Sequence, residues 1–205
     1  MTHRTRLRRA AATALTAATA AALTLTATPA TAAADVPAFL DPGQLPPHPS
    51  SAWYGGPVAG GVPDPLPFCV GGALPGATSR HRQFWTEFDT NAAQITVVER
   101  DEASARALAA LLDQAIRACP ARAEQEDPDV TAEWRNYGRL DVEEGATVHG
   151  VRTSHAGTGN DVHLFAVGRD ARTVTVVRWG QLGTFAHAPV ADFKKTTRTA
   201  VAKLH

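Results

Sequence analysis

The residues best suited to chemistry lie in a histidine-rich stretch between residues 147 and 163. His149 and His155 fall on one predicted strand, and Asp161 and His163 fall on the next. A hairpin turn between these strands would place His155 opposite Asp161 and put the three imidazoles on one face of the sheet. Imidazole and carboxylate groups bind zinc, so the four residues form a candidate metal site. The solvated face of an amphipathic strand pair would show the same alternation, and a one-residue change of register would separate the set.

A second set of residues suits ligand binding. Trp85, Trp134 and Trp179 lie in predicted strands, and tryptophan is frequent both in cores and on recognition surfaces. Arg178 precedes Trp179, where it would either line a cleft as a cationic donor or be the outward neighbour of an inward-facing tryptophan. We take Trp134, Arg178 and Trp179 as candidate ligand-binding residues.

Catalytic motifs give no comparable signal. The sequence holds no G-x-S-x-G motif, and Ser154 and His155 point to opposite faces of a strand because they are adjacent. Residues 157–159 lack the lysine and hydroxyl residue of a phosphate-binding loop. The acidic runs at 124–129 and 143–144 are typical of solvated surface. The sequence therefore predicts no catalytic residue and no cofactor.

The N-terminal 34 residues have the pattern of a cleaved signal peptide. Four arginines precede a run of Ala, Thr and Leu from residue 10 to 27, and the small residues 30–34 follow. A transmembrane anchor is the alternative, but the run holds few large apolar residues and is short for a hydrocarbon core of roughly 30 Å. The sequence thus predicts a secreted protein without a stable membrane anchor.

Removal of residues 1–34 would make the chain acidic. All 20 acidic residues follow residue 34, together with 16 of the 20 basic residues, which gives a net charge of −4 with histidine neutral. A nucleic-acid-binding domain requires a basic face, and so does a polybasic membrane-surface segment. We therefore expect neither nucleic acid nor an anionic membrane as a partner.

Two cysteines, Cys69 and Cys119, are present in the chain. In an oxidising compartment an even pair predicts one disulfide bond. Closing a loop of that length would stabilise the fold by about 4 kcal/mol on the chain-entropy model. The alternative is a pair of buried free thiols, whereas a zinc site would require further ligands.

The remaining chain divides into a Pro/Gly-rich arm (35–80) and a regular domain (81–205). The arm cannot hold long regular elements, but it carries spaced large apolar residues that would pack on the domain. We expect a loop at 121–133, strands at 83–89, 92–100, 134–142, 147–155, 161–168 and 172–179, and helices at 102–119 and 189–204. Asp101 is the predicted N-cap of the first helix, whose apolar residues fall on one stripe. This predicts an α+β fold: an antiparallel sheet of about five to six strands with two main helices packed on one face.

The order of these elements resembles the sensor-domain family of actinobacterial secreted proteins and lipoproteins, the extracellular domain of PknH-type kinases. The resemblance rests on the Ala-rich helix ending in Cys119, the Arg178–Gln181 segment that closes the strand meander, and the final helix ending at Val201–Leu204. It implies an extracytoplasmic α+β domain with a cleft that senses a ligand and is not an enzyme. The chain departs from the family in having one possible disulfide where better-known members have two, and no kinase domain is present.

Two functions follow as hypotheses. The first is a secreted, non-catalytic, sensor-type domain that binds a small molecule, a cell-wall component or a secreted protein. The alternative is a small extracellular hydrolase in which the histidine-rich hairpin would hold a metal.

Overall fold

The sheet is the central element of this protein. The computed structural model describes residues 36–205, so the predicted signal peptide lies outside the described residues. These residues form one antiparallel sheet of eight strands and three α-helices, which confirms the predicted α+β class. The strand count exceeds the expected five to six because two short strands come from the Pro/Gly-rich arm.

The strand order is β1-β3-β4-β8-β7-β6-β5, and β2 also pairs with β3. The last strand of the sequence, β8, therefore lies at the centre of the sheet, between β4 and β7. The strands are β1 (Tyr54–Gly55), β2 (Ala59–Gly60), β3 (Ser79–Trp85), β4 (Asn91–Val98), β5 (Val130–Leu140), β6 (Ala146–His155), β7 (Gly159–Asp170) and β8 (Thr173–Leu182).

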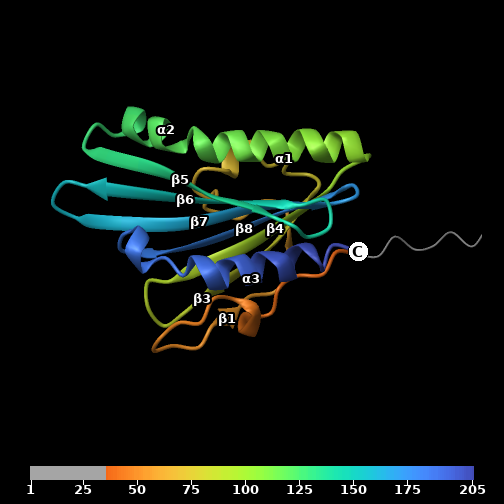
Figure 1. Ribbon diagram of the computed structural model, residues 1–205, viewed down its shortest axis with the longest axis horizontal. Helices are drawn as coiled ribbons and strands as arrows, with labels where there is room; N and C mark the ends of the chain where they lie inside the picture. Colours follow the sequence, from red (N-terminus) through yellow and green to blue (C-terminus); the bar gives the residue numbers. More distant parts are fainter. Residues whose placement is uncertain (1–35) are drawn as a thin grey trace, which may run out of the picture. The chain divides into compact units, whose positions relative to one another are not determined.

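The three α-helices are α1 (Glu102–Arg117), α2 (Cys119–Glu126) and α3 (Val190–Val201). The prediction that the two main helices pack on one face is wrong, since α1 and α3 cover opposite faces (Figure 1). On β7, Leu164 packs in the core beneath α3 while the next residue, Phe165, packs in the core beneath α1. Central strands are buried on both faces, and β7 accordingly carries the apolar run 164–167 while residues 173–177 of β8 are all buried.

The predicted N-cap of the first long helix is confirmed. The Asp101 side chain accepts a hydrogen bond of 2.7 Å from the Ser104 backbone N–H. Pro120 interrupts this helix but does not end helical structure, because a proline is tolerated in the first turn of a new helix. The predicted loop at 121–133 is therefore wrong at both ends, where α2 extends to Glu126 and β5 begins at Val130.

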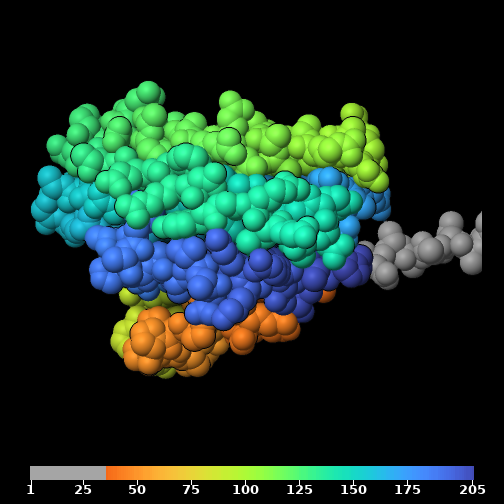
Figure 2. Space-filling view, in the orientation of Figure 1, coloured from red at the N-terminus to blue at the C-terminus, as the bar shows by residue number. Residues whose placement is uncertain are grey.

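The arm is part of the sheet and of both cores. Strands β1 and β2 pair with β3, and three short 3-10 helices complete the fold: η1 (Pro42–Gln44), η2 (Gly71–Ala73) and η3 (Phe185–His187). Leu40 is fully buried on the α3 side, and its N–H donates to the buried Gln94 side chain over 2.7 Å. Figure 2 shows the first part of the arm, coloured orange, beside α3. Thr196 Oγ1 on this helix donates a 2.7 Å hydrogen bond to the Gln44 carbonyl.

The described helices are all too short or too polar for a bilayer. None of those within residues 36–205 is long and apolar enough to cross a membrane.

Candidate functional site

The predicted disulfide is confirmed. Cys69 and Cys119 are bonded, with their Cα atoms 5.1 Å apart. The bond joins the arm to the start of α2, beside the cluster of apolar residues beneath α1. It therefore fixes the arm segment around residues 63–69, which separates two hollows on the α1 face of the sheet.

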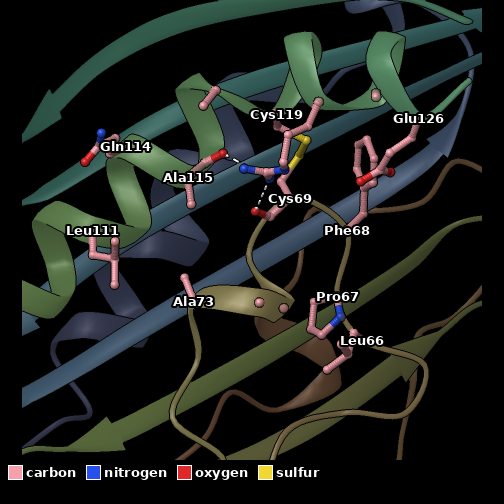
Figure 3. Close-up of a pocket in the computed structure, with 15 residues that line it drawn as sticks. Leu66, Pro67, Phe68, Cys69, Ala73, Leu111, Gln114, Ala115, Cys119 and Glu126 are labelled. Atoms are coloured by element: carbon pink, nitrogen blue, oxygen red, sulfur yellow. Dashed lines mark hydrogen bonds between the residues drawn. A yellow bond between two sulfur atoms is a disulfide. The ribbon is translucent and has the colours of Figure 1, made fainter. Parts of the chain in front are cut away.

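The first hollow, here called the disulfide groove, lies between the arm and the two helices α1 and α2 (Figure 3). It has a volume of ≈ 770 Å³. Leu66 and Leu111 are 60% and 49% exposed at its sides. Its charged residues are Arg122 and Glu126, and Arg122 donates to the carbonyls of Cys69 (2.8 Å) and Ala115 (3.3 Å).

The second hollow, here called the Arg178 pocket, lies on the other side of the same arm segment and has a volume of ≈ 380 Å³. Its walls come from the arm and from strands β3, β4 and β8. The lining residues are Pro63, Pro65, Leu66, Pro67, Phe68, Gln83, Phe84, Trp85, Asn91, Ala92, Ala93 and Arg178.

Sheet register explains how these side chains meet. Trp85, Asn91, Gly180 and His163 are successive Cα partners across β3, β4, β8 and β7. Arg178 lies two residues before Gly180 and therefore on the same face. A side chain at Gly180 would collide with the His163 ring, so the glycine leaves the space in which Arg178 and His163 meet.

Among the residues that the structure describes, Arg178 supplies the only charged side chain in the lining of this pocket. Its Nη1 donates to Asn91 Oδ1 over 2.8 Å, and its Nη2 lies 3.5 Å from His163 Nδ1. Its Nε–H is buried without a hydrogen-bond partner among residues 36–205, and no carboxylate of those residues forms an ion pair with it. Burial lowers the pKa of Arg178, while the more distant Asp161 acts in the opposite direction.

His163 lies beneath Phe68, with the two ring centroids 5.0 Å apart. Burial first, and then the positive charge of Arg178, lower the pKa of His163 from 6.5 to about 3. The imidazole is therefore neutral at neutral pH, and it presents Nδ1 as an acceptor toward Arg178. The pocket consequently keeps a single positive charge that histidine protonation does not alter near neutral pH.

The predicted register of the histidine-rich hairpin is wrong by two residues. His155 pairs with Gly159 and Asp161 pairs with Thr153, not with His155. Because the difference is an even number, the predicted metal ligands stay on one face of the sheet. They do not converge, however: among residues 36–205 no group of metal-ligating atoms contains two of the four.

Each of the three predicted histidine ligands instead has its own partner. His149 is fully buried, with Nε2 2.7 Å from Asp113 Oδ1 on α1. Trp134 Nε1–H donates to His149 Nδ1 over 3.3 Å, so His149 must carry its proton on Nε2 and donate to Asp113. His155 lies near Asp127 at the end of the hairpin, where Asp129 completes a small cluster.

The three candidate ligand-binding residues also lie apart. Trp134 is half-buried and belongs to the hydrogen-bonded chain through His149 to Asp113. Trp179 is 2% exposed and belongs to the core beneath α3, where it contacts a third, smaller hollow. Only Arg178 faces a pocket on the α1 side of the sheet.

Sequence reasoning did not identify Phe68 or Asn91 as site residues, and it noted Trp85 as a strand tryptophan without taking it as a candidate site residue. Strand alternation gives the face of each side chain within its own strand. The meeting of Asn91 with Arg178 depends on the pairing of β4 with β8, whose residues are 87 positions apart in the sequence. The position of Phe68 in the pocket wall results from its place beside Cys69, because the disulfide holds that segment over the sheet.

Comparison with known proteins adds no relative: no family model, no curated protein and no solved structure matches this chain.

Proposed function

We propose that this protein is a secreted, non-catalytic binding domain of the sensor type, and that its ligand enters the Arg178 pocket with an anionic group against the guanidinium. One observation supports the proposal above all. Among residues 36–205, no carboxylate forms an ion pair with the largely buried Arg178, and no other charged side chain lines its pocket.

The energetic reason lies in the cost of burying a charge. A buried ion that lacks a counter-ion loses much of its hydration without compensation, which destabilises the fold. An anionic ligand would supply the missing partner through charge-assisted hydrogen bonds. Functional sites are where proteins retain such unfavourable arrangements.

The larger disulfide groove is a weaker candidate for this function. Its arginine is exposed and already donates to two backbone carbonyls, and most other lining residues are alanine, glycine or leucine. The groove is favoured only by its larger volume, whereas the Arg178 pocket has a guanidinium group that can bind and orient a polar ligand.

Secretion forms part of the same proposal. The signal-peptide pattern of residues 1–34 supports it, and so does the Cys69–Cys119 bond, which is typical of oxidising compartments. The resemblance to extracellular sensor domains agrees with both. The hydrolase alternative requires His149, His155 and His163 to share one metal, whereas each of them contacts a different partner.

A thermal-shift screen tests the proposed function. The purified chain lacking residues 1–34 is heated with carboxylates, phosphates, sulfates and their uncharged counterparts. We expect at least one class of anion to raise the melting temperature of the wild type and not that of Arg178→Gln. A matched control is Arg152→Gln, since Arg152 is also partly buried with a partnerless Nε–H but is paired with Glu133. Equal stabilisation of all three proteins would contradict the proposal.

A further inference from the structure

The Arg178 pocket also carries information about the chemical class of its ligand. Resting on the proposed function, we propose that the ligand is a carboxylate-bearing sugar, with its carboxylate against Arg178 and the apolar face of its ring against Trp85.

Trp85 gives the pocket a flat, exposed wall. Its side chain is 47% exposed and is stacked beside Tyr54, which is 42% exposed, with ring centroids 6.5 Å apart and planes inclined by 23°. The Tyr54 hydroxyl donates to Glu87 Oε1 over 3.0 Å, which fixes the orientation of its ring. Two neighbouring aromatic rings held at a surface form a platform on which the C–H face of a sugar ring packs.

The platform and the cation are close enough for one small ligand. Trp85 and Asn91 are Cα partners on neighbouring strands, and Arg178 lies one strand further. Strands are spaced by about 4.8 Å, so β3 and β8 are roughly 10 Å apart. The guanidinium reaches back to Asn91 on the strand between them, so a ring on Trp85 can direct a carboxylate to Arg178.

The uncharged polar groups favour a sugar over an aromatic acid. Gln83 lines the pocket with an exposed amide that can both donate and accept hydrogen bonds, whereas the Asn91 amide is already bonded to Arg178 and to the Asp89 carbonyl. Sugar hydroxyls also donate and accept, so they would satisfy the Gln83 amide. A flat aromatic acid offers its carboxylate alone and would bury the Gln83 amide without a partner.

The remaining charge of the protein limits the ligand to a single acidic unit or a short oligosaccharide. The chain after residue 34 has a net charge of −4, so its long-range field opposes the approach of a highly charged polymer. The attraction comes instead from one local cation, and the pocket volume of ≈ 380 Å³ suits a small ligand.

Calorimetric titration with matched pairs of sugars tests this proposal. The acidic probes are glucuronate, galacturonate and N-acetylmuramate, and their uncharged counterparts are glucose, galactose and N-acetylglucosamine. Benzoate serves as an aromatic carboxylate. The proteins are the wild type, Arg178→Gln and Trp85→Ala, with Arg152→Gln and Phe88→Ala as matched controls outside the pocket; Phe88 is also an exposed aromatic residue, at 56%.

We expect at least one acidic sugar to bind at least about tenfold more tightly than its uncharged counterpart, as one charge-assisted contact implies. Arg178→Gln should abolish this difference, and Trp85→Ala should weaken binding of the acidic sugar without changing its dependence on Arg178. Both control variants should bind as the wild type does.

Two results would overturn the assignment of the ligand class. The first would leave the proposed anion-binding function intact, and the second would exclude it as well. Arg178-dependent binding of benzoate, with no acidic sugar bound, would exclude the sugar and retain the anion-binding function. Binding of none of these carboxylates, together with no Arg178-dependent anion in the thermal-shift screen, would exclude both proposals.

Discussion

At the scale of single residues, Arg178 is expected to reduce the stability of the free protein. We expect Arg178→Met to raise the free energy of unfolding by about 1 kcal/mol, because a largely buried charge that forms no ion pair with a carboxylate of residues 36–205 is replaced by an apolar chain of similar length. Arg152→Met should lower it instead, since Glu133 would lose its 2.6 Å partner. Urea denaturation measures both changes. A loss of stability in Arg178→Met as large as that in Arg152→Met would contradict the view that Arg178 is retained for binding.

His163 gives a second prediction at this scale, for acid stability. The pKa of His163 is about 3 in the folded protein, whereas the usual value for histidine, 6.5, applies to the unfolded chain. Between pH 3 and pH 6.5 the unfolded chain therefore binds more protons than the folded protein. The free energy of unfolding should therefore keep its full value above pH 6.5 and fall by up to about 1.4 kcal/mol per pH unit as the pH drops toward 3. Urea denaturation across this range should show a shallower decline for His163→Phe than for the wild type. His155→Gln, at the exposed end of the same hairpin, should keep the steeper wild-type decline; equal slopes in all three proteins would contradict the burial of a neutral His163.

At the scale of elements, the disulfide holds the arm segment that forms one wall of the Arg178 pocket. Phe68 precedes Cys69 and covers His163, so opening the bond should loosen that wall. We expect reduction to lower the free energy of unfolding by about 4 kcal/mol for the 50-residue separation, and to weaken anion binding even where the protein stays folded. Parallel denaturation and binding measurements with and without reductant test this. Unchanged binding by the folded, reduced protein would show that the segment is held by its apolar contacts alone.

Local patterns predicted much of the fold at this scale, and the exceptions have physical causes. Asp101 as an N-cap and the apolar stripe of α1 are local features, so they were predicted from the sequence. The opposite placement of α3 depends on which strands are buried on both faces, and the apolar run Leu164–Val167 is the local feature of the sequence that indicates such burial. The hairpin register was wrong because β7 begins at Gly159, which extends the pairing to His155 and leaves a tighter turn.

The candidate site was less predictable than the fold. Arg178 was identified from its position beside a tryptophan, whereas Trp179 itself proved to be core on the opposite face. The contacts of Arg178 with Asn91 and His163 require β8 to lie between β4 and β7, a long-range choice that strand alternation does not encode. The arm was expected to pack on the domain, but its two strands in the sheet are too short to produce a recognisable pattern.

At the scale of the whole molecule, the account requires that the chain leaves the cell before it folds around its disulfide. We expect secreted material to lack the N-terminal segment, with the new terminus close to residue 34, because the small residues 30–34 suit a signal peptidase. Intact-mass measurement of protein collected from the medium gives the terminus and the thiol state together. Material that retains Met1, or that carries two alkylatable thiols, would contradict the extracytoplasmic assignment.

The central claim is that an anion binds beside Arg178, and chemical-shift mapping tests it most directly. The ¹⁵N-labelled protein would be titrated with the anion that stabilises it most, and with the uncharged counterpart of that anion. The account predicts that backbone amide shifts gather at Phe68, Asn91, Ala93 and Gly180, and that Arg178→Gln removes them while Arg152→Gln does not. Shifts that gather along the disulfide groove, or that persist unchanged in Arg178→Gln, would contradict it.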